Sequence, residues 1–576
     1  MSIALVLACL VLAAPAGAQE GYSKTSYVVP VTQPDELGDP VTIDTDVYLP
    51  TTPPPPAGHP LVMVFHGGGS NKDSGYDAAY AAFFARNGYA AVLYSQRGHG
   101  NSTGQTAVAG PKEMRDLFDV AAWALGRGGR TDPAHPDFRI DSTRIALQGY
   151  SQGGLHTNLG QVWHGDPALN PYGIFFRALL PGNTPDRVFK ALIDEQVVKM
   201  TFGVGLLGTY TVLGSTGGRV APAVHRWIAT AAADQPELYG GGLLCDATGH
   251  DTETSTMRQD LAARSVGCFT ARMRTPSMWA QAFDDELFTP DMAIRMWREM
   301  PSGARNRLYL DMAGHAAPAG DPEVLRDKRR LQLMFLDHHL RDRRPEPPLV
   351  VYWTRDPKVR VPGQPYAYPP DAWERQTSKT WPPAGIVERH YGLTADGRAL
   401  RDRTGPAGTL ALTPLAQNSA NDPVAQAATS SSPLGTSPVP GSVPSTTLPG
   451  SIAGFVTDPF ATAQELSGAT SARLTWTPAS PDTQLVLQVY DQAPDGTLTL
   501  LSRGVKGLRR ATPGTPLRVR VTGTTFSARI RPGHRVLAWV MAGNFPFYKP
   551  YAGSLGGALQ VGKGATLTLP LRPYPG

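Results

Sequence analysis

Apolar runs alternate with amphipathic stretches through the first third of the chain. Residues 61–65 (Leu-Val-Met-Val-Phe) and 90–94 (Ala-Ala-Val-Leu-Tyr) are continuous apolar runs, which are typical of strands buried on both faces. Residues 76–87 and 112–125 instead repeat apolar positions at helical spacing. Strands and helices that alternate in this way predict an α/β fold with a mostly parallel sheet covered by helices.

The pattern changes twice further along the chain. Residues 161–269 are rich in Gly, Ala and Thr with helical fragments, which predicts a helical cap inserted between two parts of the sheet domain, 24–160 and 270–345. In residues 346–576 helical periodicity gives way to short apolar runs between Gly, Pro and Asp turns, which predicts an all-β sandwich. Within it, residues 404–450 are rich in Pro, Ser, Thr, Ala and Gly and are expected to form a long loop or linker.

The N-terminus carries a targeting pattern. Residues 3–14 form an apolar stretch too short to span a bilayer, and Ala16-Gly17-Ala18 follows as a small-x-small cleavage site. We therefore expect a signal peptide over residues 1–18 and a secreted or periplasmic protein, although no Lys or Arg precedes the apolar run. Cys9 offers the alternative of a lipid-attachment site, with very little apolar sequence ahead of it.

Composition excludes several classes of function. The formal net charge of +5 is spread along the chain without a basic cluster, so no nucleic-acid partner is expected. No metal or other cofactor is expected either, because metal-ligand patterns are absent and His338-His339 are neighbours on a predicted helix, about 100° apart. No membrane span is predicted. Cys245 and Cys268 could form a disulfide in an oxidising compartment.

A strand, a sharp turn and a helix are predicted around Ser151. The apolar residues 145–147 lead into 149–153 (Gly-Tyr-Ser-Gln-Gly), and a helix-compatible stretch follows. Such a turn exposes the serine at the edge of a sheet, and its glycines avoid collisions with the neighbouring strand and helix. The pattern G-x-S-x-G recurs around Ser102, but no helical pattern begins directly after it, so Ser151 is favoured as the nucleophile.

Two later strands are expected to bring an acid and then a histidine to the same edge of the sheet. Residues 276–283 end at Asp284 and Asp285, and His315 follows the strand at 307–310. The order Ser, acid, His is that of α/β-hydrolases, in which the histidine is the general base and the acid orients it. Asp285 is favoured over Asp284, and Asp311 is a more distant alternative.

The groups that hold the oxyanion in such a site are expected to be backbone N–H groups. The N–H of Gln152 and one from Gly67 or Gly68, in the turn after the first buried strand, would hold the oxyanion. His156 lies on the helix behind Ser151 and is expected to point away from the serine hydroxyl.

The sequence resembles the X-Pro dipeptidyl-peptidase and cocaine esterase-like (CocE/NonD) serine hydrolases over nearly the whole mature chain. The resemblance rests on residues 97–104 (Arg-Gly-His-Gly-Asn-Ser-Thr-Gly), 149–153, 285–288, 314–315 and 335–340, together with Trp373 and Trp381-Pro382-Pro383. It implies an α/β-hydrolase domain with a helical cap, then a jelly-roll domain beside the active-site entrance. Members cut esters or amides. The esterase members offer a tyrosine hydroxyl to the oxyanion where this chain has His66-Gly67-Gly68-Gly69, which argues against carrying over their specificity.

The function expected from the sequence is hydrolysis of an ester or amide through an acyl-enzyme on Ser151, with acyl esters favoured. The alternative is an Xaa-Pro dipeptidyl-peptidase, which needs carboxylates for the substrate's α-amino group; Asp194, Glu195 and Glu237 are candidates, or plain surface charges. A non-catalytic binding protein on a hydrolase scaffold is disfavoured by the complete triad. The partner is thus a small ester, amide or short peptide, while the acyl group, the leaving group and a homo-oligomeric state stay open.

Overall fold

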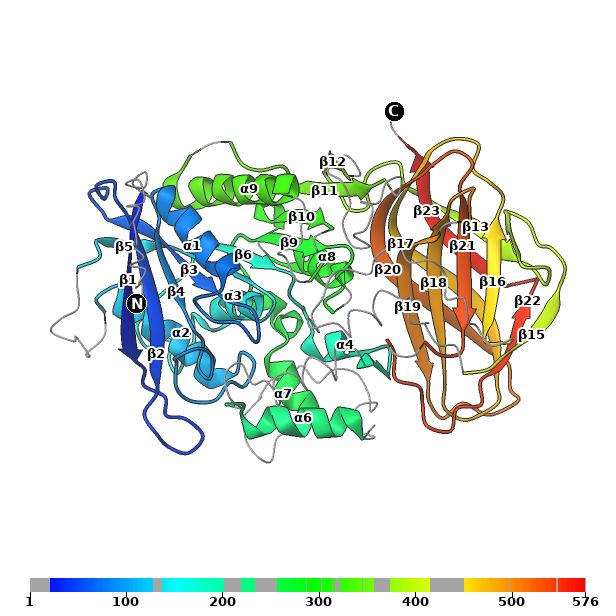
Figure 1. The fold of residues 1–576 in the computed structure, drawn as a ribbon, viewed down its shortest axis with the longest axis horizontal. Helices are drawn as coiled ribbons and strands as arrows, with labels where there is room; N and C mark the ends of the chain where they lie inside the picture. Colours follow the sequence, from blue (N-terminus) through cyan, green and yellow to red (C-terminus); the bar gives the residue numbers. More distant parts are fainter. Residues whose placement is uncertain are drawn as a thin grey trace, which may run out of the picture.

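The computed structural model consists of two bodies that lie side by side, a sheet flanked by helices and a β-sandwich (Figure 1). The helix-flanked sheet comes from the first part of the chain, and the sandwich forms the other end of the molecule. The expected signal peptide lies outside the described residues. The structure describes residues 21–127, 137–200, 219–233, 256–285, 287–301, 303–312, 314–315, 322–343, 345–356, 373–414, 450–496, 498–544 and 547–574.

The first sheet is mostly parallel, as the alternating pattern predicts. Its strands follow the order β1-β2-β4-β3-β5-β6-β9-β10-β11-β12, with parallel pairing from β4 through β11 and antiparallel strands at both edges. Strands β3, β4, β6, β9 and β10 are buried at every position. The bounds are β1 (Tyr22–Pro30), β2 (Thr42–Pro50), β3 (His59–Phe65), β4 (Ala90–Tyr94), β5 (Ile140–Tyr150), β6 (Ala178–Gly182), β9 (Met278–Ala282), β10 (Arg307–Asp311), β11 (Val350–Arg355) and β12 (Trp373–Ser378).

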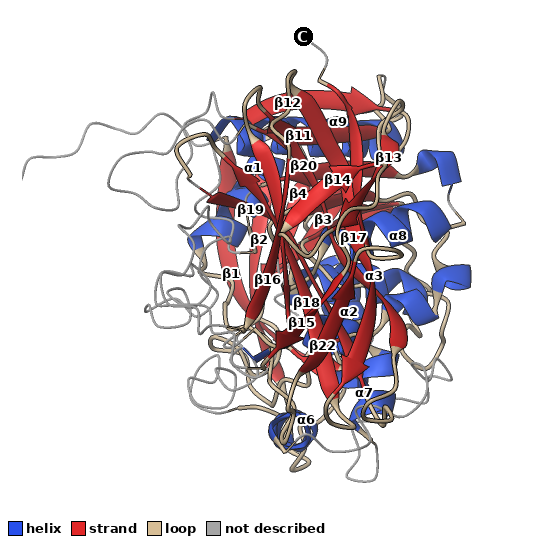
Figure 2. Ribbon diagram, turned by 90° about the vertical axis from the view of Figure 1, so that its right-hand side faces the viewer, coloured by secondary structure: helices blue, strands red, loops and turns tan. Residues whose placement is uncertain are grey.

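Helices cover both faces of this sheet. Helices α1 (Gly75–Arg86) and α9 (Pro322–Arg341) share one apolar cluster with Val62, Val64 and other residues of that face. Helix α2 (Pro111–Ala124) packs on the opposite face against Leu61 and Met63, and α3 (Gln152–Trp163) and α8 (Pro290–Glu299) lie on the same side (Figure 2). Alternate side chains of each buried strand thus enter opposite layers, which confirms the predicted α/β-hydrolase architecture.

The segment expected to form the cap lies below the sheet in Figure 1, between the sheet domain and the sandwich. Its apolar residues pack on α3 and on the N-terminal end of α2 in one cluster that includes Leu159 and Trp227. Residues 201–218 and 234–255 of this segment lie outside the described part of the chain. The described elements are α4 (Val188–Leu192), β7 (Ile193–Asp194), β8 (Val197–Val198), α6 (Pro222–Ala232), α7 (Met257–Ala263) and 3₁₀ turns at Val266–Cys268 and Thr270–Arg272; a further 3₁₀ turn, Gly303–Arg305, precedes β10.

The second body is an antiparallel β-sandwich, as expected from the loss of helical periodicity. One layer pairs β19-β18-β21-β16, and the other pairs β13-β23-β17-β20, with β22 also beside β17 and β15 beside β22. Strand β14 pairs antiparallel with β13 and parallel with β16. Buried side chains such as Trp476, Leu487 and Val540 fill the space between the layers. The bounds are β13 (Val387–Leu393), β14 (Arg398–Arg401), β15 (Gly408–Leu412), β16 (Ile452–Thr457), β17 (Gln464–Pro478), β18 (Thr483–Gln492), β19 (Leu498–Leu508), β20 (Leu517–Ile530), β21 (Arg535–Met541), β22 (Gly557–Val561) and β23 (Thr566–Pro573).

Two elements differ from the sequence expectation. Strand β11 falls within residues 346–576, but it extends the first sheet by pairing parallel to β10 and meets β20 of the sandwich at one position, Arg355↔Ala528. A buried apolar run has the same pattern in either sheet, so the sequence could not assign it. Strand β15 lies inside the expected loop 404–450 and pairs with β22, because its Gly-Thr-Leu-Ala-Leu sequence alternates enough to form a short edge strand. Residues 415–449 lie outside the described part.

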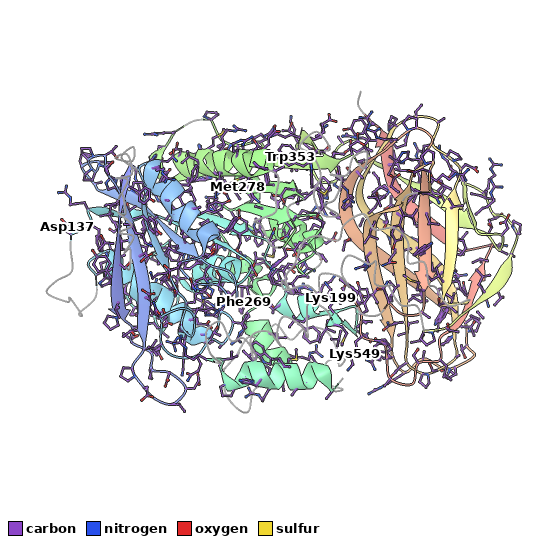
Figure 3. The ribbon with its side chains drawn as sticks, in the orientation of Figure 1. Asp137, Lys199, Phe269, Met278, Trp353 and Lys549 are labelled. Atoms are coloured by element: carbon purple, nitrogen blue, oxygen red, sulfur yellow. The ribbon has the colours of Figure 1, made fainter. Side chains whose placement is uncertain are left out.

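Backbone hydrogen bonds join the cap to the sandwich. The N–H of Met200 donates to Phe547 O (2.8 Å), and the N–H of Lys549 donates to Val198 O (2.8 Å), so the end of β8 and the residues after it pair antiparallel with a sandwich loop at Lys549 (Figure 3). The side chain of Lys506 also pairs with Glu195 at 2.6 Å. Among the described residues, none of the helices has the length and apolar character needed to cross a membrane.

Candidate active site

Ser151 stands in the sharp turn between β5 and α3. Its φ of 57° and ψ of −121° are rare for a residue with a side chain, and its N–H is held by Gly182 O at 2.9 Å. The flanking glycines are needed for space. A Cβ on Gly149 would lie 2.4 Å from Gly153 O, and a Cβ on Gly153 would lie 2.3 Å from Phe65 O. The predicted strand, turn and helix thus meet at a serine that the backbone presents at the edge of the sheet.

The structure brings Ser151, His315 and Asp285 together. His315 Nε2 lies 3.0 Å from Ser151 Oγ, and its Nδ1 lies 2.9 Å from Asp285 Oδ2. An ionised carboxylate only accepts hydrogen bonds, so Nδ1 carries the proton and Nε2 is free to accept the hydroxyl proton of the serine. Asp285 is itself fixed, because its Oδ1 accepts the N–H groups of Leu287 (3.0 Å) and Phe288 (2.9 Å).

The alternative acids occupy other places. Asp284 Oδ1 accepts the N–H of Gly314 at 3.1 Å and so supports the turn that carries His315. Asp311 is buried in an ion pair with Lys328 at 2.8 Å. Of the acids weighed from the sequence, Asp285 is therefore the one that contacts the histidine.

The alternative nucleophile and base are buried in structural contacts. Ser102 Oγ donates to Ser95 O (2.6 Å) and accepts the N–H of Asp44 (2.8 Å). His156 Nδ1 lies 3.0 Å from Gln152 O, one turn back on α3, and burial lowers the pKa of His156 to about 4. Both groups support the fold around the sharp turn at residues 149–153, which we call the elbow.

The turn expected to hold the oxyanion lies against the serine. A Cβ on Gly67 would be 3.6 Å from Ser151 Cβ, and Gly68 follows in the same turn. Gln152 is the first residue of α3, where N–H groups lack partners within the helix. The two backbone segments named from the sequence are thus neighbours on either side of Ser151.

A buried hydrogen-bond network that no sequence pattern predicts connects these two segments. Gln96 donates its N–H to His66 Nε2 (2.9 Å), so the His66 ring carries its proton on Nδ1 and donates it to Gly67 O (2.7 Å). The Gln96 side chain donates to His66 O (2.8 Å) and accepts from the side chain of Gln152 (2.6 Å). Burial, with a smaller contribution from the adjacent His99 ring, holds the pKa of His66 well below its usual value. Neutral His66 therefore fixes the turn to the elbow.

Residues of the cap and of the sandwich both pack near His315. The Phe288 ring lies edge-on to His315, with ring centres 5.0 Å apart, and packs in an apolar cluster with Val197 of the cap and Tyr548 and Tyr551 of the sandwich. The cluster excludes water from one side of the histidine.

A cavity of about 360 Å³ lies between cap and sandwich. Asp194 and Glu195 line it, together with cationic residues that include Arg503 and Lys506. Arg503 also lines a small cavity beside Asp285, so the two cavities adjoin. The third candidate carboxylate, Glu237, lies outside the described residues, as does Cys245; Cys268 is disulfide-bonded.

The histidine pair on α9 contacts a carboxylate. The ligand atoms of His338, His339 and Glu346 lie within 4.8 Å of one another, closer than the sequence spacing suggested. However, Glu346 pairs with Arg307, and burial, followed by His338, Arg307 and Arg305, lowers the pKa of His339 to about 4. This cationic setting opposes the binding of a metal ion.

Two parts of the chain match the family models of known proteins. Residues 38–171 match the family model of X-Pro dipeptidyl-peptidase (S15 family), and residues 352–562 match the X-Pro dipeptidyl-peptidase C-terminal non-catalytic domain. The first match contains the elbow and the turn before it, and the second covers most of the sandwich. No curated protein matches the sequence.

Solved structures share the fold across both bodies. An α-amino acid ester hydrolase has a TM-score of 0.67 at 17% identity, covering 98% of this chain and 99% of its own. A CocE/NonD family hydrolase from Staphylococcus aureus has a TM-score of 0.65 at 12% identity, covering 96% and 97%. An aminopeptidase from the marine sediment archaeon Thaumarchaeota archaeon has a TM-score of 0.64 at 14% identity, covering 98% and 99%.

Fold and family matches together define a serine hydrolase of the α/β-hydrolase class. More particularly, a match to the X-Pro dipeptidyl-peptidase (S15) family is followed by a match to the C-terminal domain of X-Pro dipeptidyl-peptidases, and the fold is that of a CocE/NonD family hydrolase. The resemblance noted from the sequence is thus confirmed.

Proposed function

We propose that the protein is a secreted hydrolase that cleaves carboxylic esters through an acyl-enzyme on Ser151. The observation that supports this most directly is the continuous chain of contacts from Ser151 Oγ through His315 to Asp285, at 3.0 and 2.9 Å. Serine needs such a base to become a nucleophile at neutral pH. The proposed layout is a catalytic domain at 24–160 and 270–345 that β11 and β12 extend, a cap at 161–269 and a sandwich from β13 onward.

The reaction follows from the hydrogen-bond directions. Ser151 Oγ attacks the carbonyl carbon while His315 Nε2 takes its proton, and Asp285 stabilises the resulting imidazolium. The N–H of Gln152 and that of Gly67 or Gly68 donate hydrogen bonds to the developing oxyanion, and one such donor contributes about 3 kcal/mol to transition-state stabilisation. His315 then protonates the leaving group. Water attacks the acyl-enzyme by the same route in reverse, with His315 again as base.

The second candidate is release of N-terminal X-Pro dipeptides. The S15 match supports it, as do Asp194 and Glu195, whose carboxylates line the cavity between cap and sandwich and could receive a substrate ammonium group. Lys506 already neutralises Glu195, at 2.6 Å. For that reason we favour the ester reaction.

Two measurements test the proposal. A fluorophosphonate probe should label the wild-type protein and not Ser151→Ala; equal labelling of both would refute the nucleophile, and a wild-type protein without labelling would favour a binding function. Turnover of p-nitrophenyl acyl esters is then compared with that of Gly-Pro and Ala-Pro p-nitroanilides at equal concentrations. A higher kcat/KM for the anilides would replace the esterase assignment by the peptidase one.

The cellular location has its own test. The mature protein, collected from outside the cytoplasm of the producing cell, should begin at Gln19. An N-terminus at Met1, with the protein retained in the cytoplasm, would contradict secretion.

A further inference from the structure

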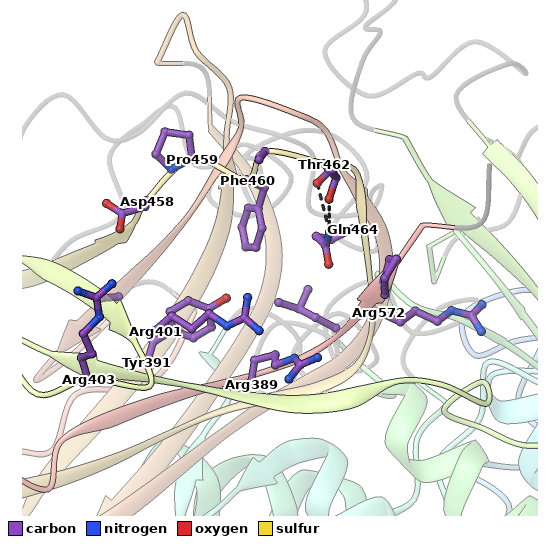
Figure 4. Close-up of a pocket in the computed structure, with 14 residues that line it drawn as sticks. Arg389, Tyr391, Arg401, Arg403, Asp458, Pro459, Phe460, Thr462, Gln464 and Arg572 are labelled. Carbon is purple, nitrogen blue, oxygen red and sulfur yellow. Dashed lines mark hydrogen bonds between the residues drawn. The ribbon is translucent and has the colours of Figure 1, made fainter.

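The sandwich contains a cavity of about 500 Å³ whose lining residues differ from those of the two cavities near the triad (Figure 4). Its floor comes from β13 and β14, and the loop 458–462 between β16 and β17 covers it. This volume falls in the range of small-ligand sites, roughly 300–1,000 Å³. The lining residues are Arg389, Tyr391, Ala399, Arg401, Arg403, Asp458, Pro459, Phe460, Ala461, Thr462, Gln464, Leu571, Arg572 and Pro573.

The strand register gathers arginines on the floor. Tyr391 pairs with Arg401 across β13 and β14, and Arg389, two residues before Tyr391 on β13, shares the face of Tyr391. Strand β14 ends at Arg401, and Arg403 lines the cavity from the turn that follows.

These arginines are poorly neutralised. Within the described residues, Arg389 and Arg403 have no carboxylate within ion-pair distance, and Arg401 has only the exposed Asp402 at 3.4 Å. By contrast, Arg572 on the opposite wall pairs with Glu465 at 2.6 Å. Cationic side chains that line one cavity repel one another, and a bound anion would relieve that repulsion.

Aromatic and polar groups complete the walls. Tyr391 is buried in the floor, and the Phe460 ring projects into the cavity from the covering loop (Figure 4). That loop is held rigidly, because Phe460 N–H donates to His534 O (2.9 Å) and Gly533 N–H donates to Phe460 O (2.8 Å). Gln464 uses its amide N–H to bind Thr462 Oγ1 (3.0 Å), which leaves its amide oxygen as an acceptor for a hydroxyl.

We propose that this cavity binds an acidic saccharide. The planar guanidinium groups of Arg389, Arg401 and Arg403 suit a planar carboxylate or a sulfate group. The half-buried Phe460 ring suits the C–H face of a sugar ring. A bare anion would use the arginines and leave the Phe460 ring without a role. The sandwich thereby holds the enzyme on an acidic polysaccharide while the catalytic domain works on a separate substrate.

The test measures binding of oligosaccharides to the full-length protein by calorimetry at low salt. Three matched tetrasaccharides are compared: one with uronic acid carboxylates, one carrying sulfates, and one neutral. At least one acidic oligomer is expected to bind at least tenfold more tightly than the neutral one, with an affinity that falls as salt is added. Whichever acidic oligomer binds more tightly identifies the anion. Equal binding of the neutral oligomer, no binding at all, or equal competition by inorganic phosphate would overturn the proposal.

Variants locate the site. Arg389→Gln and Arg401→Gln should each weaken binding of the acidic oligomer at least tenfold, and Phe460→Ala should weaken it without changing the salt dependence. Arg473→Gln is the matched control, because Arg473 is an exposed arginine on β17 of the same sandwich and does not line the cavity. Ester turnover should be unchanged in all four. Equal loss of binding in Arg473→Gln would refute the site, as would full binding in Arg389→Gln and Arg401→Gln.

Discussion

Replacing Asp285 by asparagine tests the proposed role of His315 as the base. The hydrogen bonds around residue 285 determine the orientation of the asparagine amide. Asp285 Oδ1 accepts two backbone N–H groups, from Leu287 and Phe288, and Oδ2 accepts from Gln281 Nε2 (3.1 Å) and His315 Nδ1 (2.9 Å). In Asp285→Asn the single oxygen is held by the two backbone donors, so the NH₂ group faces His315. The histidine must then place its proton on Nε2, toward the serine.

The expected loss of kcat in Asp285→Asn follows from that tautomer of His315. A histidine that carries its proton on Nε2 cannot accept the hydroxyl proton, and loss of the correct tautomer lowers kcat by about 10⁴-fold, or ~5 kcal/mol. The lost contact to Gln281 costs ~1 kcal/mol of folding stability, which leaves the protein folded. The assays are kcat/KM for a p-nitrophenyl ester and the rate of fluorophosphonate labelling, with thermal unfolding measured alongside.

Asp284→Asn is the matched control, since it makes the same chemical change at the neighbouring residue. Asp284 accepts from Gly314 N–H at 3.1 Å, a bond that an amide oxygen also accepts. We expect Asp284→Asn to lower kcat/KM less than tenfold. The reasoning would be refuted if Asp285→Asn retained more than about one hundredth of the activity, or if the two variants lost activity equally.

Three further substitutions test the surroundings. Gly153→Ala should abolish soluble expression because its Cβ would lie 2.3 Å from a carbonyl oxygen, whereas Gly165→Ala, with no atom within 4 Å, should remain soluble; a folded Gly153→Ala protein would contradict the packing of the elbow. Burial raises the pKa of Asp77 to about 7, so its ionisation opposes folding increasingly as the pH rises from about 4 to 7. Asp77→Asn should therefore raise the free energy of unfolding by up to ~4 kcal/mol at pH 8 and little at pH 4, and denaturant titrations showing equal gains at both would count against it. Burial lowers the pKa of His156 to about 4, so this residue costs stability as the pH falls below about 6.5, where the unfolded chain takes up the proton. His156→Phe should lose less stability between pH 7 and 4 than the wild type and keep its ester turnover within about threefold; loss of turnover would assign His156 a part in the reaction.

The parts of the fold and site that the sequence could predict depend on short, local patterns. The elbow at Ser151 combines an apolar strand, closely spaced glycines and a helix start within a few residues. Asp285 and His315 each follow an apolar strand directly, and parallel strands end at one edge of a sheet. Chain order alone therefore brings these groups together, before any tertiary contact is known.

The parts that could not be predicted depend on contacts between distant segments. Gln96 connects His66 with Gln152, and each of these residues comes from a different loop or helix. A polar residue after a strand carries no sign of such a role. The arginine-lined cavity depends likewise on the register of β13 and β14, which determines that Arg401 faces Tyr391. One residue of slip would turn these side chains to the other face.

The position of β11 has a consequence for how the protein can be divided. This strand lies beyond Ser151, Asp285 and His315 in the sequence, yet it pairs with β10 and carries β12 as the next strand of the same sheet. A fragment that ends near residue 346 would keep the whole triad but expose the hydrogen-bonding edge of β10, a surface that invites aggregation. The chain thus closes its first domain with strands supplied by the segment that leads to the second. We therefore expect a working minimal enzyme to include β11 and β12.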